Sequence, residues 1–241
     1  MSTPLTLANL AGSSLASSEI MLATNWERLQ PRLIESIWET LYMVSLTMLA
    51  GGIAGLVVGV LLTTTRRGGI LQNGPVYWLL NLLVNIIRPI PFIILIAAIG
   101  PVTKAAIGTT VGTEAATFVM AIAATFAVAR IVEQNLVAVD PGVIEAARAM
   151  GASPARIIWD VLVKEALGPI ILGYTFIFIA VIDMSAMAGY IGGGGLGDFA
   201  ITYGYKTFDW NVTLVATIII IVMVQLAQGL GNWLSHKVMH R

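Results

Sequence analysis

The sequence predicts an all-α protein that crosses a membrane several times, and three observations support this fold class. Of the 241 residues, 57% are hydrophobic and only 11% are charged, whereas about 25% are charged in soluble globular domains. The mean hydropathy is +0.87. Uncharged runs long enough for a membrane helix, which needs about 20 apolar residues, recur along the chain. These runs leave little chain for a domain outside the membrane.

The charged residues divide the apolar sequence into five predicted transmembrane helices. Residues 40–65 form the first, an uncharged run that ends before two arginines. The second is predicted to be discontinuous because Arg88, Pro89 and Pro91 interrupt it, and proline removes a backbone donor. Such a break is tolerated where a helix faces protein or a water-filled cavity. The predicted spans are residues 40–65, 77–100, 113–135, 166–190 and 211–235.

The distribution of lysine and arginine predicts the orientation of these spans. With the N-terminus outside and the C-terminus in the cytoplasm, eight basic residues are cytoplasmic and four are outside, as the positive-inside rule requires. Arg88 is left within the membrane. The cytoplasmic set is Arg66, Arg67, Arg130, Arg148, Arg156, Lys164, Lys237 and Arg241, and the outer set is Arg28, Arg32, Lys104 and Lys206.

The chain is expected to divide into an N-terminal extension, residues 1–34, and a membrane domain, residues 35–241. The extension is rich in Ser, Thr and Ala and has no basic segment followed by a continuous apolar core. We therefore predict that it is not a cleaved signal peptide. Weak amphipathy or disorder is the simplest interpretation, and the sequence assigns it no role.

Few residues are suited to catalysis or metal binding. The sequence has no cysteine, and both histidines, His236 and His240, lie within the last six residues. An intramembrane enzyme would need a nucleophile with a base, or metal ligands, inside the spans. A formal net charge of zero gives no indication of nucleic-acid binding. We therefore predict no catalytic residue, no metal site and no nucleic-acid partner.

The loop between the third and fourth predicted spans, residues 140–165, contains two helix signals. Asp140 and Pro141 form an N-cap followed by proline at the first helical position, and Gly151 supplies a stop ten residues later. Ser153 and Pro154 begin a second helix, in which Asp160 is expected to pair at i,i+4 with Arg156 and Lys164.

The first of these short helices carries an apolar stripe, which consists of Val143, Ala147 and Met150. A helix of this length is not stable alone in water, so something must dock on it or hold it. Ala146 and Ala147 form a small-residue surface, and Glu145 and Arg148 lie beside it at i,i+3. A surface hairpin that only packs back on the spans is the alternative.

Three motifs extend this interpretation. Glu145-Ala146-Ala147, followed after three residues by Gly151, resembles the "EAA" loop of ABC importer permeases, the cytoplasmic coupling helix that docks on the ATP-hydrolysing subunit. The segment from Asn85 to Leu95 and the segment from Ser185 to Gly197 resemble the permease subunit of the methionine ABC importer. This subunit belongs to the binding-protein-dependent transport system inner membrane component family. The likeness covers about residues 35–241. One departure is Lys164, where the family has proline.

The resemblance implies a type I ABC importer permease located in the bacterial cell (inner) membrane. The expected assembly is a homodimer of this chain with two cytoplasmic ATPase subunits and an extracytoplasmic methionine-binding protein. The dimer would form the translocation path for methionine, in both enantiomers. ATP and Mg²⁺ would be bound by the partner ATPase, and this chain would have no cofactor and no enzymatic activity. The ATPase-coupling residues would be Glu145, Ala146, Ala147, Arg148, Met150 and Gly151.

Two other functions compete with this expectation. The same architecture would serve an importer of another small solute, such as a different amino acid, a phosphonate or an osmolyte. A self-sufficient secondary transporter or channel is less favoured, because the predicted span number is odd and the spans contain no series of acidic residues for a proton relay. The sequence also lacks a Gly-x-x-x-x-Gly-Lys-Ser/Thr phosphate loop, so energy from ATP must arrive through a partner.

Five residues are candidates for the translocation path or its gate: Arg88, Asp183, Met184, Ser185 and Met187. Arg88 and Asp183 are charges inside predicted spans, and each costs about 2.5–3.5 kcal/mol at the bilayer centre. They are therefore expected to face the interior of the helix bundle. A structural pairing of the two is favoured over a role in the path. The two methionines suit a closing gate, although apolar packing also explains them.

The segment after the fourth predicted span is rich in glycine and aromatic residues. Gly192, Gly194 and Gly197 match a dinucleotide-binding pattern, but they follow a span and no helix is predicted after them. We interpret them as a flexible or tightly packed outer end of the span. The aromatic residues are expected to form an outer interfacial belt, with a docking surface for the binding protein as the alternative. They are Tyr190, Tyr203, Tyr205, Phe208 and Trp210.

Overall fold

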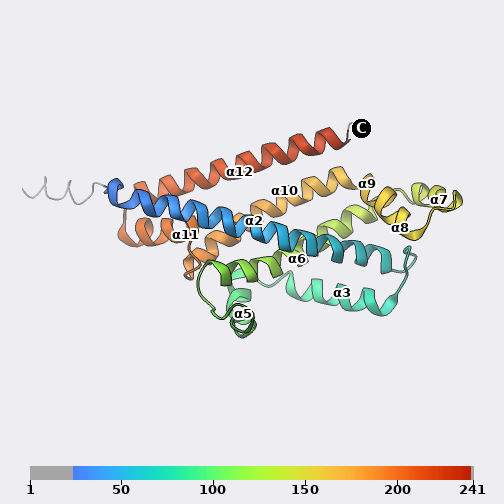
Figure 1. Ribbon diagram of the computed structural model, residues 1–241, viewed down its shortest axis with the longest axis horizontal. Helices are drawn as coiled ribbons and strands as arrows, with labels where there is room; N and C mark the ends of the chain where they lie inside the picture. Colours follow the sequence, from blue (N-terminus) through green and yellow to red (C-terminus); the bar gives the residue numbers. More distant parts are fainter. Residues whose placement is uncertain (1–23, 240–241) are drawn as a thin grey trace, which may run out of the picture.

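The computed structural model describes residues 24–239, in which helices joined by short turns and loops are the only regular secondary structure (Figure 1). The long helices are α2 (Trp26–Thr65), α6 (Thr113–Val137), α10 (Leu167–Tyr190) and α12 (Trp210–Met239). All four are long and apolar enough to cross a membrane. The shorter helices are α3 (Gly74–Ile87), α4 (Phe92–Ala98), α5 (Gly100–Ile107), α7 (Pro141–Ala149), α8 (Pro154–Arg156), η1 (Ile157–Leu162), α9 (Val163–Glu165), α11 (Gly195–Phe199), η2 (Ala200–Gly204) and η3 (Tyr205–Thr207).

The first helix is longer than the predicted span. α2 has 40 residues, which corresponds to about 60 Å, whereas the hydrocarbon core of a bilayer is about 30 Å thick. Its C-terminal end agrees with the prediction, because the backbone becomes extended at Arg66. Its N-terminal end is at Trp26, where the Asn25 side chain accepts a hydrogen bond from the backbone N–H of Arg28. The expected boundary between residues 34 and 35 therefore falls inside a continuous helix.

The predicted second span is two helices, as its prolines suggest, but they do not continue in one direction. α3 and α4 are bent by 109° at the break between residues 87 and 92. α3 has 14 residues, or about 21 Å, which is too short to cross a bilayer alone. The segment is thus either a broken span, as predicted for residues 77–100, or a re-entrant loop.

Small residues set the distance between α2 and α6, the most extensively packed helix pair in the fold. Gly51, Gly55 and Gly59 are buried on one face of α2. A methyl group added at Gly55 would lie 2.5 Å from Cβ of Val128 and 2.7 Å from the carbonyl oxygen of Thr125. The Gly-x-x-x-Gly spacing therefore allows the two backbones to approach closely, as it does in other membrane helix pairs.

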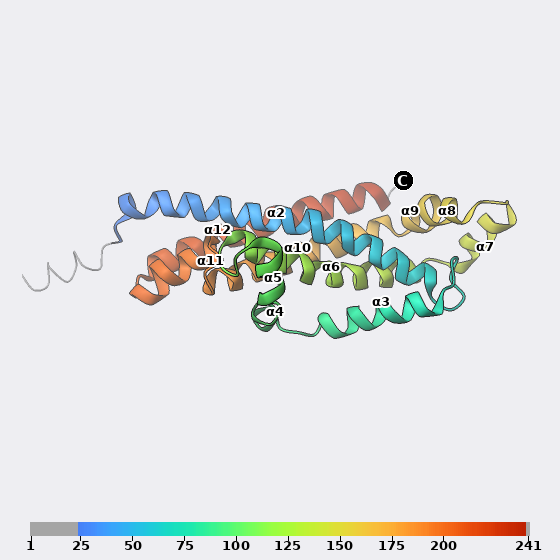
Figure 2. The ribbon, with the colours of Figure 1, turned by 60° about the horizontal axis from the view of Figure 1, so that its bottom comes forward.

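The two ends of the molecule are distinct. Figures 1 and 2 show that α2 begins at one end of the long axis, whereas α7, α8 and the last turn of α12 lie toward the other. α3 starts near the end of α2 and runs back beneath it (Figure 2). The first and last described helices therefore begin at the same end and run in the same direction, which fits an odd number of crossings.

Of the two interpretations of the glycine segment after α10, flexible or tightly packed, the structure favours the second. A helix, α11, begins at Gly195, although no helix was predicted there. Gly194 and Gly195 have φ of +76° and +81°, which favours glycine. The Glu39 carboxylate accepts a hydrogen bond from the backbone N–H of Gly195 at 2.6 Å, and the Thr40 hydroxyl accepts one from Leu196 at 2.8 Å. These contacts tie the start of α11 to α2.

The glycine contact between α2 and α6 gives a first prediction. Gly55→Ala should destabilise the purified chain by about 1–3 kcal/mol, because the added methyl group overpacks the interface. Thermal unfolding in detergent measures this as a lower midpoint temperature. Gly229→Ala on α12 is the matched control, because a methyl group there has no heavy atom within 4 Å. An equal effect of the two substitutions would contradict the packing argument.

Candidate functional site

The helix predicted at residues 141–150 is present, and its ends are built as expected. The Asp140 side chain accepts a hydrogen bond from the backbone N–H of Gly142 at 2.8 Å, and Pro141 occupies the first position of α7. At the other end, Gly151 has φ of +77°. The N–H groups of Gly151 and Ala152 donate to the carbonyl oxygens of Arg148 and Ala147, at 2.9 and 3.1 Å. This is a Schellman motif, so both ends of α7 are fixed by local sequence.

The second helix of the loop also begins where it was predicted, and its interior differs. Ser153 caps it by accepting a hydrogen bond from the N–H of Arg156. Residues 157–162 then form a π-helical turn, η1, and the helical path breaks at Ala166, just before Gly168 and Pro169. The break near Pro169 lies close to the position where Lys164 replaces the proline of the resembled pattern.

One of the two ion pairs predicted in this helix is formed. Lys164 Nζ lies 2.8 Å from Asp160 Oδ1, and this hydrogen bond lowers the pKa of the Asp160 carboxyl below its ordinary value. The expected Arg156–Asp160 ion pair is not among those that the described residues form. The two expected pairs share the Asp160 carboxylate, which is bound to Lys164.

The three residues of the apolar stripe predicted on α7 differ in how far they are buried. Ala147 is buried, whereas Val143 is 38% and Met150 is 80% exposed. Ala146 is also exposed. An apolar side chain as exposed as Met150, on a short helix outside the predicted spans, is available for contact with another molecule.

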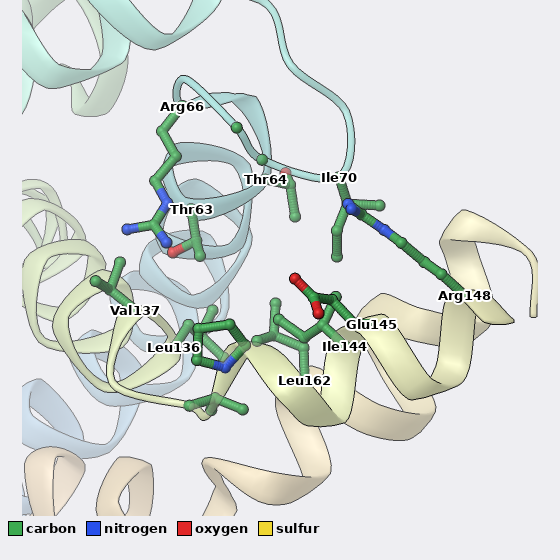
Figure 3. A pocket seen from close by; sticks show the side chains of 14 residues that line it. Thr63, Thr64, Arg66, Ile70, Leu136, Val137, Ile144, Glu145, Arg148 and Leu162 are labelled. Carbon is green, nitrogen blue, oxygen red and sulfur yellow. The ribbon is translucent and has the colours of Figure 1, made fainter.

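A cavity of about 160 Å³ separates α7 from the end of α2. Figure 3 shows its lining, which includes Thr63 and Thr64 of α2, Leu136 of α6, and Glu145 and Arg148 of α7. Both charged residues of the coupling motif therefore border the cavity, and Ala146 and Met150 do not. Because this space is not filled by side chains, α7 is not packed tightly against α2.

The candidate path residues fall into two groups. Ser185 is 3% exposed and its hydroxyl donates to the carbonyl oxygen of Ile182 at 2.7 Å, so its hydrogen-bonding capacity is used within α10. Met184 is partly buried against the main hydrophobic core. Asp183 and Met187, by contrast, are exposed on the surface of the single chain, as is Arg88 at the bend between α3 and α4.

The expected pairing of Arg88 with Asp183 is wrong for the single chain. No ion pair joins them among the described residues, and both side chains are exposed instead of facing the interior of one chain's bundle. Asp183 belongs to an exposed stripe on α10 with Phe176, Met187 and Tyr190. A carboxylate within a membrane helix does not face lipid without a large cost, so this stripe requires a polar or protein environment.

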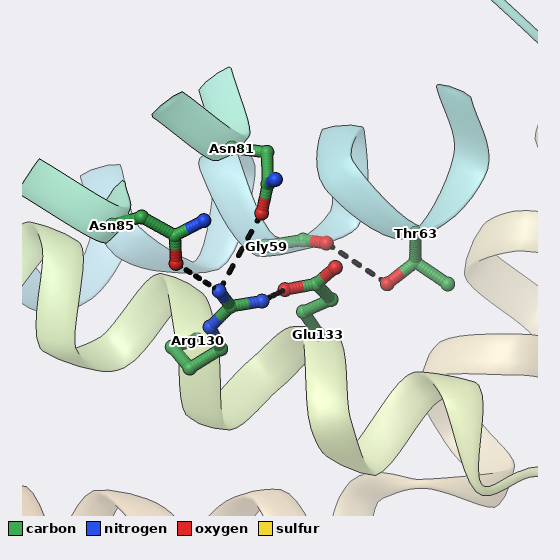
Figure 4. Close-up of polar contacts among 6 residues, drawn as sticks. All are labelled: Gly59, Thr63, Asn81, Asn85, Arg130 and Glu133. Atoms are coloured by element: carbon green, nitrogen blue, oxygen red, sulfur yellow. Dashed lines mark hydrogen bonds and ion pairs between the residues drawn. The ribbon is translucent and has the colours of Figure 1, made fainter. Parts of the chain in front are cut away.

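Sequence reasoning missed a polar cluster between α3 and α6. Arg130 was counted among the cytoplasmic charges although it falls within the predicted span 113–135, and it lies inside α6, about two turns before the end of the helix. Its guanidinium lies 2.6 Å from the Glu133 carboxylate and donates to the side-chain oxygens of Asn81 and Asn85 (Figure 4). Glu133 is 6% exposed. The i,i+3 and i,i+4 spacings of these residues were the available signal.

The outer aromatic residues are mostly exposed. Tyr190, Tyr205, Phe208 and Trp210 are 58–77% exposed. Tyr203 instead packs against a small apolar cluster that includes Phe199 and Val212. Phe208 has φ of 60°, the one positive value outside glycine in the described chain.

Comparison with known proteins relates this geometry to transport. The chain is 44% identical over 209 residues to the probable D-methionine transport system permease protein of Vibrio cholerae, covering 87% of this chain and 93% of that protein. It is 40% identical over 199 residues to the methionine import system permease protein of Bacillus subtilis, covering 83% and 90%.

Solved structures of ABC transporters also resemble this chain. A chain of the MetNI methionine ABC transporter, in an inward-facing conformation, matches with a TM-score of 0.85 and 38% identity, covering 88% of this chain and 98% of that chain. A chain of an amino acid ABC transporter matches with a TM-score of 0.72 at 22% identity, which shows a shared fold only.

The family model for binding-protein-dependent transport system inner membrane components matches residues 67–240, which include α3 to α12 and therefore α7, the cavity and the polar cluster. The chain therefore belongs to the family of binding-protein-dependent transport system inner membrane components and is a multi-pass protein of the bacterial inner membrane.

Proposed function

We propose that this chain is the transmembrane permease subunit of an ATP-driven importer of methionine. The observation that carries the proposal is the 44% identity to a probable D-methionine permease over 87% of the chain, together with 38% identity to a chain of a methionine ABC transporter. Transport of both enantiomers is part of the proposal. A binding protein outside the cell delivers methionine to the permease.

In this proposal α7 is the coupling helix that contacts a separate ATPase. Three features support this role: both ends of α7 are capped, Met150 and Val143 are exposed, and the cavity beside α2 leaves room for displacement. α7 lies toward the same end as the C-terminus (Figure 1), so the proposed N-out, C-in topology places it in the cytoplasm. ATP and Mg²⁺ are bound by the ATPase, and this chain supplies the contact through which their energy is used.

The working unit in this proposal is a homodimer with two ATPase subunits. The exposed stripe of α10 supports the dimer, because Asp183 needs a neighbour other than lipid. A second copy provides that environment if the two α10 helices face a shared central path. Asp183 and Met187 then line the path, whereas Met184 and Ser185 support α10 from inside one chain. Closure of the two ATPases would move α7 and open the path alternately to each side.

Reconstitution tests the proposed function. The chain, its ATPase and its binding protein in liposomes should accumulate labelled L- and D-methionine when ATP is present and show no accumulation without the ATPase. Competition by a set of amino acids, phosphonates and osmolytes identifies the preferred solute. Accumulation in the absence of the ATPase, or preference for a solute other than methionine, would count against the proposal.

The exposed methionine of α7 gives a prediction for the ATPase contact. Met150→Asp should weaken binding of the ATPase about tenfold or more, because it places an unpaired charge in an apolar contact. Affinity of the purified permease for the ATPase measures this. Leu71→Asp is the matched control: Leu71 is 47% exposed in the turn between α2 and α3 and is not part of α7. Equal binding by the Met150 variant and the control would exclude this face of α7.

The exposed carboxylate of α10 gives a prediction for the path. Asp183→Asn should leave assembly and ATP hydrolysis intact and lower methionine uptake about tenfold, because a charged hydrogen bond to the substrate ammonium is lost. Size-exclusion chromatography and vesicle uptake separate these effects. Ser185→Ala is the comparison, because the Ser185 hydroxyl donates only within α10. Loss of assembly in the Asp183 variant would instead assign it a structural role.

A further inference from the structure

In the polar cluster of α3 and α6, the arginine of a largely buried ion pair within α6 also hydrogen-bonds to two asparagines of α3. We propose that Asn81, Asn85, Arg130 and Glu133, here called the α3–α6 clamp, transmit the movement of α7 to α3. This inference rests on the proposed function, because it assumes that an ATPase moves α7. The four residues act as positioning residues and do not bind substrate.

The clamp begins with an ion pair within α6. Arg130 Nη1 donates to Glu133 Oε2 at 2.6 Å, and the exposed fractions of the two side chains are 20% and 8%. The carboxylate neutralises a guanidinium that would otherwise be unpaired within a membrane helix. Because the pair is i,i+3 on one helix, it does not by itself hold α6 to any neighbour.

The second guanidinium nitrogen makes the link between helices. Arg130 Nη2 donates to Oδ1 of Asn81 at 3.4 Å and to Oδ1 of Asn85 (Figure 4). The two asparagines are one turn apart on α3, so Arg130 binds side chains from two successive turns of α3. Hydrogen bonds of this kind, in which the donor is charged, are stronger than neutral ones.

α3 also contacts its neighbours through apolar side chains, including the partly buried Tyr77 and Leu80. Val84 is its one buried residue, and it packs in a small cluster with Leu62 of α2 and Ala129 of α6. Several large side chains of α3 are exposed, including Trp78, which is 64% exposed, and Ile86, which is 55% exposed. The clamp therefore adds directional polar bonds between α3 and α6 to an apolar contact that is small.

The position of the clamp connects two regions of the proposed mechanism. Toward the C-terminus, α6 ends at Val137, and α7 begins at Pro141 after a three-residue link. On α3, the clamp residue Asn85 lies three residues before Arg88, at the C-terminal end of this helix. At this point the chain bends by 109° into α4. α6 is in turn locked to α2 by the glycine contacts. A displacement of α7 thus moves α6, and the clamp carries that movement to the Arg88 end of α3.

The variant Asn81→Leu with Asn85→Leu tests this link, because it removes the bonds between the helices and leaves the Arg130–Glu133 ion pair intact. In the reconstituted complex we expect assembly and ATP hydrolysis to persist while methionine taken up per ATP hydrolysed falls about tenfold. Gln134→Leu is the matched control, since Gln134 is exposed on α6 and its side chain makes no hydrogen bond within residues 24–239. Unchanged uptake per ATP in the double variant would overturn the proposal.

A second pair of variants tests the α3–α6 clamp if the double leucine variant fails to assemble. Glu133→Gln should lower uptake per ATP, because Arg130 loses its carboxylate. Adding Asn85→Asp to Glu133→Gln moves the carboxylate onto α3, so that the ion pair itself joins the two helices. We expect the addition to restore uptake per ATP. Failure of this rescue, in a variant that assembles, would contradict the clamp and leave only a structural role for the pair.

A distance measurement tests the clamp without any substrate. The chain has no native cysteine, so spin labels can be placed at Leu79→Cys on α3 and Val137→Cys on α6, both exposed positions. Labelled chain is diluted with unlabelled chain to isolate distances within one subunit. The distance between the two labels should be the same in nucleotide-free and ATP-bound complexes. In the variant with both leucine substitutions, it should differ between these two states. A nucleotide-dependent change in this distance when the clamp is intact would overturn the proposal. Absence of methionine uptake by the wild-type complex would instead count against the proposed function alone.

Discussion

The close contact between α2 and α6 is the constraint on which the rest of the structure depends. Lipid tails are as apolar as leucine, so membrane helices associate through close packing instead of burial from water. Gly51, Gly55 and Gly59 remove the side chains that would hold α2 and α6 apart. The resulting pair forms a rigid frame: α3 attaches to one side through the polar cluster, α10 packs on another, and α7 extends from the end of α6.

This frame explains why the short helix α7 is defined although it has almost no core of its own. Only Ala147 of α7 is buried, and a cavity of about 160 Å³ lies beside the helix. The caps at Asp140 and Gly151 stabilise the helix locally, and the frame fixes where it projects. A helix that is ordered but loosely packed is suited to receive force from a partner. Tight packing of α7 against α2 would prevent the displacement that the proposed mechanism requires.

Much of the fold could be predicted from the sequence, because hydropathy, charge spacing and helix caps are local signals. The ends of α6, α7 and α10 agree closely with the predicted ranges. The helix after Gly194 depends on a contact with a distant segment, the hydrogen bond between Gly195 and Glu39. The angle between α3 and α4 and the π-helical turn at residues 157–162 were not predicted from local signals. The expected pairing of Arg88 with Asp183 is absent within the single chain. Periodicity along one chain does not reveal which neighbour each charge faces.

The central claim is that α7 is the mechanical contact between this chain and a separate ATPase. The most direct test uses a variant that lacks residues 145–151, keeps its insertion in the membrane, and is purified with the tagged ATPase. The account predicts that the ATPase is not retained and that ATP-dependent methionine uptake is abolished. Retention of the ATPase together with continued uptake would contradict the account.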